Sequence, residues 1–253
     1  MRVIDSFIIA FATYSRIPMP RAAWSDENRQ YAMCFFPLIG AAVGATLWGW
    51  LLLCDALGLG QLMRGAVAAA IPLLVTGGIH MDGFMDTCDA LASWQTKERR
   101  LEILPDSHVG AFAVIGCCAY LLVTAGLLSE ATATDAPPLA AGFVLSRTLS
   151  AWTMTAFKKA RPDGMLGGFA KTANARAVRI ASALYAIVCI AVWALCGGRL
   201  AAICLLIATV CLLAYRRMAY AYFGGVTGDL AGWFLQVTEL CLSAAIIMGG
   251  KLL

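Results

Sequence analysis

The sequence is poor in charged residues, which make up only 13% of its 253 positions, against about a quarter in soluble proteins. Hydrophobic residues account for 61%, and the mean hydropathy is +0.78. This apolar content excludes a disordered chain, and it exceeds what one soluble domain of this length can bury. At about 20 residues per span, the composition predicts an all-α, polytopic membrane bundle of about seven transmembrane helices.

Three further absences narrow the functional class. The net charge of +4 includes no long basic run, so we expect no nucleic-acid partner. None of the ten cysteines forms a CxxC pair, and most lie in apolar runs, which is typical of small apolar side chains in membrane helices. The first apolar stretch is too short for a cleavable signal peptide, and no small-residue cleavage site follows it.

Seven apolar runs define the expected spans within a single membrane domain, residues 1–253. Residues 1–31 form a cytoplasmic or interfacial segment, in which 1–16 is expected to be a short helix. An Asp-rich cytoplasmic motif loop covers 80–108, and a basic cytoplasmic loop covers 158–179. The runs are 33–54, 65–79, 109–128, 138–157, 180–197, 199–222 and 232–250.

Basic residues are distributed unevenly between the two sides of this topology. Fifteen of the 19 Lys and Arg residues fall in loops on one side, and only Arg64, Arg199 and Lys251 fall on the other. Because cytoplasmic loops are enriched in Lys and Arg, the basic side is predicted to be cytoplasmic. Arg147 lies within a span, where an arginine is expected to face the bundle interior or a polar cavity.

Three aspartates lie at helical spacing in the segment TGGIHMDGFMDTCDAL. Asp82, Asp86 and Asp89 fall within roughly 60° of one another around a helix. Carboxylates on one stripe repel one another unless a cation lies among them, and their oxygens suit Mg²⁺. The pattern favours a metal site with His80 beside it, and Gly83 would allow close approach of a ligand. The alternative is a solvated helix face at the membrane boundary.

Two further polar segments lie on the same predicted side, and each begins a span. The first precedes the run at 109–128 and offers either ligand-binding groups or a helix N-cap. The second is a Gly-rich opening of the last run, which either cradles an anion or forms an ordinary capped turn. Their candidate substrate-binding residues are Asp106, Ser107, Gly110, Thr227, Gly228 and Glu239, and Asp229 is a further candidate metal ligand.

All three polar segments lie at cytoplasmic ends of spans, so one cluster can gather them. Carboxylates, Mg²⁺ and the cations of Arg147, Lys158 and Arg161 are the groups that phosphoryl transfer uses. Positive-inside anchoring explains much of the charge of the loop 158–179 as well.

These motifs resemble the cobalamin synthase family. The resemblance rests on TGGIHMDGFMDTCDAL, RRLEILPDSHVGAF and GGVTGDLAGWFLQVTE, with YSRIPMPR and FFPLIGAAVG near the N-terminus, and it spans nearly the whole chain. It implies a bacterial inner-membrane, Mg²⁺-dependent enzyme that joins adenosylcobinamide-GDP to α-ribazole or its 5′-phosphate. GMP is released and adenosylcobalamin or its 5′-phosphate is formed, with the active site facing the cytoplasm.

The resemblance also suggests roles for the candidate residues. Asp82, Asp86, Asp89 and Asp229 would hold Mg²⁺, and Asp82, Asp86 or His80 would act in catalysis. Gln236 departs from the family, which usually has Glu there. Membrane lipid surrounds such an enzyme, and self-association or contact with other late cobalamin-pathway enzymes stays open.

Two alternatives differ from this interpretation in their chemistry. A CDP-alcohol phosphotransferase of lipid synthesis also uses an Asp-rich motif, but DGFMDTCD lacks the Ala-Arg of that motif. A cation transporter would use the aspartates as a pathway, yet they lie at the edge of a span, whereas transporter sites lie near the bilayer midplane.

Overall fold

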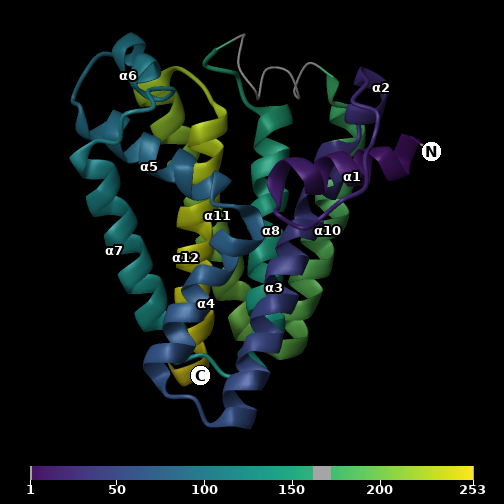
Figure 1. Ribbon diagram of the computed structural model, residues 1–253, viewed down its shortest axis with the longest axis vertical. Helices are drawn as coiled ribbons and strands as arrows, with labels where there is room; N and C mark the ends of the chain where they lie inside the picture. The colour runs from purple at the N-terminus through teal and green to yellow at the C-terminus, as the bar shows by residue number, and fades with distance from the viewer. Residues whose placement is uncertain (1, 162–171, 253) are drawn as a thin grey trace.

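The computed structural model describes residues 2–161 and 172–252, and in these ranges it is helical apart from one isolated bridge (Figure 1). Long helices run between the two ends of the molecule, and most of the short ones gather at one end. The helices are α1 (Arg2–Tyr14), α2 (Asp26–Arg29), α3 (Ala32–Leu57), α4 (Gln61–Thr76), α5 (Ile79–Ala92), α6 (Lys97–Ile103), α7 (Ala111–Leu128), the 3₁₀ helix η1 (Ala133–Asp135), α8 (Ala136–Ala156), α10 (Ala175–Cys196), α11 (Gly198–Phe223) and α12 (Gly228–Leu252).

The polytopic helical bundle that the composition predicts is confirmed. Among the described residues, α3, α7, α10, α11 and α12 are long and apolar enough to cross a membrane. The pair α4 and α5 passes the same test together, although it is bent by 100°, which raises the number of candidate spans from five to six. The remaining predicted run, 138–157, is α8, whose polar residues lower its hydropathy below that of the candidate spans.

Helix α8 lies inside the bundle and tolerates polar side chains because other helices surround it. It packs against α3, α10 and α12. A Cβ atom at Gly44 of α3 would lie 2.4 Å from the Cβ of Ala140, so only glycine permits this approach. Trp193 of α10 donates a hydrogen bond from Nε1 to the carbonyl of Pro138 at 3.0 Å. The polar groups of α8 are thereby kept within protein, where hydrogen-bond partners exist.

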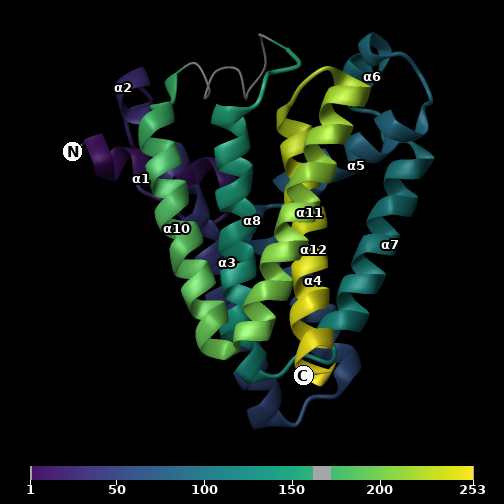
Figure 2. The same ribbon diagram turned by 180° about the vertical axis from the view of Figure 1, so that it is seen from behind.

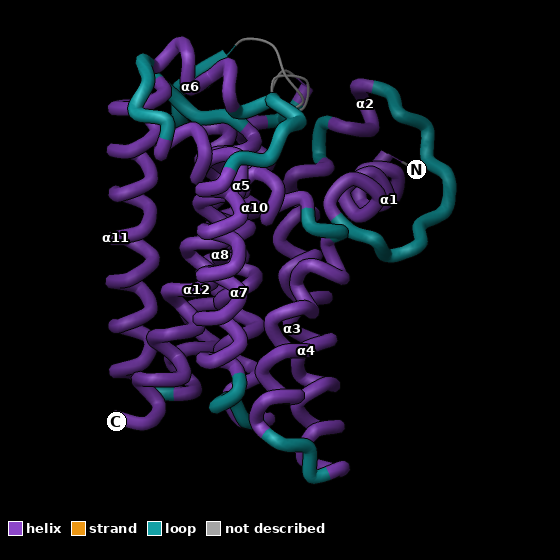
Figure 3. The backbone as a smooth tube through the Cα atoms, turned by 60° about the vertical axis from the view of Figure 1, so that its left-hand side comes forward, coloured by secondary structure: helices purple, strands orange, loops and turns teal. Residues whose placement is uncertain are grey.

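The two ends of the bundle differ in content. Helices α1, α2 and α6, the end of α8 and the start of α10 lie at one end, and the C-terminus lies at the other (Figures 1 and 2). Most basic residues within the described ranges therefore lie at one end, as the predicted alternation of spans requires. Figure 3 shows α1 nearly end-on beside long helices that run vertically, so α1 lies across the bundle direction. This orientation is the one expected of an interfacial helix.

Helix boundaries depart from expectation mainly around the Asp-rich segment. The predicted loop 80–108 contains most of α5 and all of α6, and α2 is a second helix within the predicted segment 1–31. Thr96 begins α6 as an N-cap because its side chain accepts a hydrogen bond from the backbone of Arg99. A local cap of this kind stabilises a short polar helix that hydropathy alone does not reveal.

Candidate functional site

The Asp-rich helix is set across the bundle by two consecutive glycines. Gly77 has φ of 69° and Gly78 has φ of 79°, a left-handed conformation that side-chain-bearing residues rarely adopt. The chain therefore turns by 100° between α4 and α5. The backbone N–H of Asp82 bonds to the carbonyl of Gly78 at 2.9 Å, which starts the new helix immediately after the turn.

Helix α5 then packs against the first turn of α12 through glycine. A Cβ atom on Gly83 would lie 2.8 Å from both the Cα and the carbonyl oxygen of Asp229. The expectation that Gly83 makes room for a ligand is therefore wrong, because the backbone of α12 occupies that space. The same contact brings Asp229 near Asp82 and Asp86, close enough for the three charges to act on one another.

Asp89 faces a different neighbour. Its Oδ2 accepts a hydrogen bond from the backbone N–H of Gly110 at 2.7 Å, and its Oδ1 accepts one from Ala113 at 2.8 Å. The first N–H groups of a helix have no partner within the helix, so the Asp89 carboxylate satisfies donors at the start of α7. The spacing predicted a metal ligand, whereas the structure uses both oxygens of Asp89 to cap α7.

The metal-ligand role of Asp89 stays a prediction, because a carboxylate that accepts two N–H bonds keeps further lone pairs. Within residues 2–161 and 172–252, no three His, Cys, Asp or Glu side chains are arranged to hold a metal ion. Mg²⁺ does not require such a group, because it keeps several waters and usually binds one or two carboxylates together with substrate phosphates. The oxygen donors of Asp82, Asp86 and Asp229 fit that requirement.

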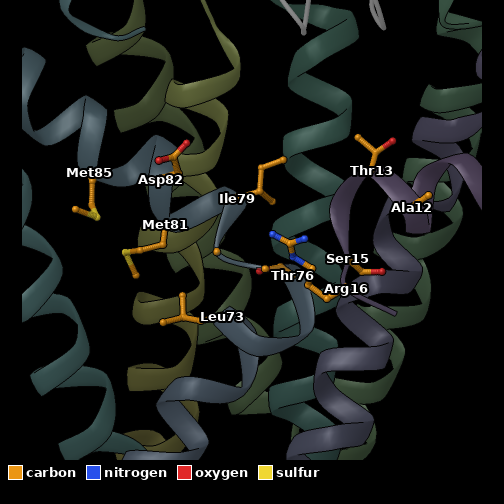
Figure 4. Close-up of a pocket in the computed structure, with 12 residues that line it drawn as sticks. Ala12, Thr13, Ser15, Arg16, Leu73, Thr76, Ile79, Met81, Asp82 and Met85 are labelled. Carbon is orange, nitrogen blue, oxygen red and sulfur yellow. The ribbon is translucent and has the colours of Figure 1, made fainter. Parts of the chain in front are cut away.

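Asp82 lies between two cavities. A cavity of about 140 Å³ is lined by His80, Asp82 and Asp229 together with Tyr14 and Ser150. A larger cleft of about 570 Å³ lies between α1 and the α4–α5 turn, and Asp82 lines it as well (Figure 4). A residue at the junction of two cavities can reach groups bound in both.

His80 is buried beside the smaller cavity, with 6% of its surface exposed. Its ring stacks on Tyr14 with centroids 6.3 Å apart and meets the edge of Phe36 at 5.5 Å. Its Nε2 has no hydrogen-bond partner among the described residues. A buried, unpaired ring nitrogen on a cavity wall is available to a bound molecule.

The segment before α7 forms a local turn instead of joining the aspartates of α5. Asp106 Oδ1 forms hydrogen bonds with the backbone N–H of His108 at 3.0 Å and with its ring Nδ1 at 2.7 Å. These hydrogen bonds hold the pKa of the exposed Asp106 below its usual value. Gly110 is the N-cap residue of α7, so the expectation that Asp106 or Ser107 caps this helix is wrong. The capping carboxylate comes from Asp89.

The Gly-rich opening of α12 is a capped turn that also positions part of the basic loop. Thr227 Oγ1 accepts a hydrogen bond from the backbone N–H of Leu230 at 3.2 Å, as the capping alternative predicted. Val226 donates to the carbonyl of Lys158 at 2.9 Å and accepts from Ala160 at 3.0 Å. Gly225 permits this pairing, because a Cβ atom there would lie 2.5 Å from the Lys158 carbonyl oxygen.

Arg161 follows this pairing and lies near enough to Asp229 for their charges to interact. The side chain of Lys159 donates a hydrogen bond to the carbonyl of Met154, and burial lowers its pKa to about 8. Lys158 stays exposed. Residues 162–171 of the predicted basic loop, including Lys171, lie outside the described residues.

Arg147 and Glu239 pair with each other deep in the bundle. Arg147 is fully buried and Glu239 is 3% exposed, and Nη1 of the arginine donates to Oε1 of the glutamate. Nη1 also donates to the carbonyl of Phe143 at 2.9 Å, and Ser146 Oγ donates to the same carboxylate at 3.2 Å. The expectation that Arg147 faces the interior is confirmed. Neither side chain lines the two cavities at Asp82, although the sequence predicted that both bind substrate.

Sequence reasoning did not single out two residues that the structure places at the cavities. Tyr14, the last residue of α1, lines the smaller cavity, and Arg16, two residues after α1, lines the cleft. Both residues belong to the segment YSRIPMPR, one of the segments that carry the family resemblance. This segment is far from the Asp-rich motif in the sequence, so its contact with the cavities at Asp82 could not be predicted.

Comparison with known proteins agrees with the resemblance. A family model described as cobalamin-5-phosphate synthase matches residues 6–247. An adenosylcobinamide-GDP ribazoletransferase of Lachnoclostridium phytofermentans is 40% identical over 248 residues, covering 98% of this chain and 95% of the relative. Proteins of the same name from Desulfitobacterium hafniense and Clostridium botulinum (strain Alaska E43) are 33% and 30% identical, covering 92% and 94% of this chain and 91% and 95% of the relatives. No solved structure matches the chain. Match length and identity together show that the chain belongs to the cobalamin-5-phosphate synthase family.

Proposed function

We propose that this protein is an adenosylcobinamide-GDP ribazoletransferase, which joins adenosylcobinamide-GDP to α-ribazole or its 5′-phosphate and releases GMP. The observation that supports this best is the glycine-mediated contact between α5 and α12. It gathers Asp82, Asp86 and Asp229 at one end of the bundle, beside two cavities and the cation of Arg161. Opposite charges at one site suit a reaction in which a diphosphate is held and cleaved.

Asp82, Asp86 and Asp229 are the residues that would hold Mg²⁺. The bound ion would offset negative charge on the diphosphate. In the transfer, an oxygen–phosphorus bond forms between a ribose hydroxyl and the phosphorus that carries the cobinamide, and the bond from that phosphorus to GMP breaks. The hydroxyl proton passes to a carboxylate, for which Asp82 is placed best because it lines both cavities. His80 orients a bound group through its free Nε2.

The orientation in the membrane follows from charge. The end that carries α1, α2, α6 and residues 158–161 faces the cytoplasm in this proposal, because Lys and Arg are concentrated in the sequence segments at this end. Both substrates then reach the site from the cytoplasm without crossing the bilayer. The bacterial inner membrane is the membrane that such an arrangement implies.

The test is product release by purified protein in lipid nanodiscs. GMP release that requires Mg²⁺, adenosylcobinamide-GDP and a ribazole acceptor supports the proposal. Release of CMP from a CDP-alcohol, or ion flux without chemistry, would instead support the alternative classes. Asp82→Asn should reduce GMP release at least 100-fold while the protein stays folded. Asp26→Asn, an exposed residue paired with Arg29, is the matched control and should keep full activity.

A further inference from the structure

The cleft between α1 and the α4–α5 turn contains one cation that the proposed mechanism does not use. Two charged residues line it, namely Arg16, which follows the end of α1, and Asp82 of α5. Figure 4 shows the Arg16 guanidinium projecting into the space between the end of α1 and Ile79. An arginine and a catalytic carboxylate therefore line the same cleft from two different elements.

The position of Arg16 is built into the fold. Its backbone N–H donates to the carbonyl of Val75 at 2.8 Å, which ties the end of α1 to the last turn of α4. The side chain of Arg16 packs against Gly77. A Cβ atom on Gly77 would lie 2.3 Å from Arg16 Nε and 2.8 Å from Arg16 Cγ. Gly77 thus serves the bend between α4 and α5 and also leaves room for the arginine. The adjacent Ser15 is buried and donates to the carbonyl of Phe11 at 2.7 Å, which fixes the end of α1.

The guanidinium of Arg16 forms no ion pair with any described residue. Arg64 and Arg147, by contrast, are each paired with an acidic residue. Arg16 and Asp82 share a cleft without pairing, so a bound group can lie between a cation and a carboxylate. A phosphate is such a group, since it accepts hydrogen bonds from arginine and shares a metal ion with a carboxylate.

We propose that Arg16 binds a phosphate group of a substrate in this cleft and presents it to Asp82. The inference rests on the proposed function for the identity of the substrates. The planar guanidinium donates two parallel hydrogen bonds to phosphate oxygens, which a lysine ammonium does not reproduce. The phosphate is either part of the diphosphate of adenosylcobinamide-GDP or the 5′-phosphate of the ribazole acceptor.

The experiment compares Arg16→Gln and Arg16→Lys with wild type in nanodiscs. Arg21→Gln is the matched control, since Arg21 is also exposed and lies in the same connection but outside the cleft. Loss of a charge-assisted hydrogen bond is expected to raise one KM by roughly 10- to 100-fold in Arg16→Gln. Arg16→Lys should fall between Arg16→Gln and wild type. The control should match wild type.

Two acceptors identify which phosphate is bound. If Arg16 holds the acceptor's phosphate, Arg16→Gln raises the KM for α-ribazole 5′-phosphate and leaves that for α-ribazole unchanged. If it holds the diphosphate, the KM for adenosylcobinamide-GDP rises with either acceptor. Unchanged KM values for all three compounds in a folded Arg16→Gln protein would overturn the inference.

A binding measurement separates this inference from the proposed function. Calorimetry with GDP, which carries both phosphates of the diphosphate, and with α-ribazole 5′-phosphate requires no turnover, and Arg16→Gln should weaken the binding of one of them roughly 10- to 100-fold. If wild type releases no GMP from the two substrates, the proposed function fails while the binding comparison still tests Arg16. If wild type is active and Arg16→Gln binds both compounds as wild type does, only the role of Arg16 fails.

Discussion

The buried pair of Arg147 and Glu239 yields the sharpest prediction, because the sequence and the structure assign it different roles. Only 1% and 2% of the two side chains is exposed, and the hydrogen bonds of the pair stay within α8 and α12. If Glu239 is replaced by Leu, Arg147 keeps the Phe143 carbonyl and loses its counter-charge. Removing one partner of a buried ion pair typically destabilises a protein by about 3–5 kcal/mol. We expect Glu239→Leu and Arg147→Met each to lower the free energy of unfolding by about this amount.

The double variant Arg147→Met/Glu239→Leu should recover most of that loss. Apolar side chains of similar size remove both charges, and such replacements are often neutral or stabilising. The measurement is the free energy of unfolding in mixed micelles for wild type, both single variants and the double variant. Glu102→Leu is the control, because Glu102 pairs with Arg99 on the surface, where both side chains are 63% exposed. That change should cost less than about 1 kcal/mol.

Activity decides between a structural role and substrate binding. Neither residue of the pair lines the two cavities at Asp82, so the double variant should release GMP within about threefold of wild type at a temperature where it is folded. A double variant that is folded and stable but inactive would refute this reasoning. It would instead support the substrate contact that the sequence predicted for Arg147 and Glu239.

Three further changes test other parts of the structure. Asp89→Asn weakens the cap of α7 and should lower the free energy of unfolding by about 1–3 kcal/mol. GMP release per folded molecule should stay within a few-fold of wild type. A loss of activity like that of Asp82→Asn would instead support a metal-ligand role for Asp89. Gly83→Ala should push α5 from α12 and reduce GMP release at least tenfold, whereas Gly126→Ala, where a Cβ meets nothing within 4 Å, should not. Burial lowers the pKa of Lys159 from 10.5 to about 8, so the folded state binds fewer protons above pH 8 and stability should rise between pH 8 and 10. The thermal midpoint of wild type relative to Lys159→Met should rise over that range, and parallel curves would contradict the assignment.

Local patterns in the sequence were sufficient for the helices and for part of the site. Helical spacing placed Asp82 and Asp86 on one helix, and α5 confirms it. The two glycines before them are also visible in the sequence, and their positive φ values produce the turn. Such features depend on neighbours a few residues away, which the sequence displays directly.

Contacts between distant segments were not predictable in the same way. The spacing of Asp89 is as regular as that of Asp86, and only the position of α7 shows that its carboxylate binds backbone N–H groups 21 and 24 residues later. Gly83 was expected to face a ligand because a missing side chain does not reveal what fills the space. Arg16 was interpreted as a positive-inside residue, since nothing local shows that α1 ends beside the turn between α4 and α5.

The bend between α4 and α5 explains how a chain with so few charges can keep several carboxylates beside a membrane. Helix α4 has 16 residues, which at 1.5 Å per residue gives about 24 Å, less than the roughly 30 Å of a bilayer core. A straight continuation would carry Asp82 and Asp86 further along the same direction, past α7 and without contact to the start of α12. The 100° turn instead lays α5 across the end of the bundle, where Gly83 meets Asp229 and the carboxylates gather beside both cavities. The same turn places Gly77 under Arg16, so one pair of glycines brings the acidic and the basic side of the cleft together.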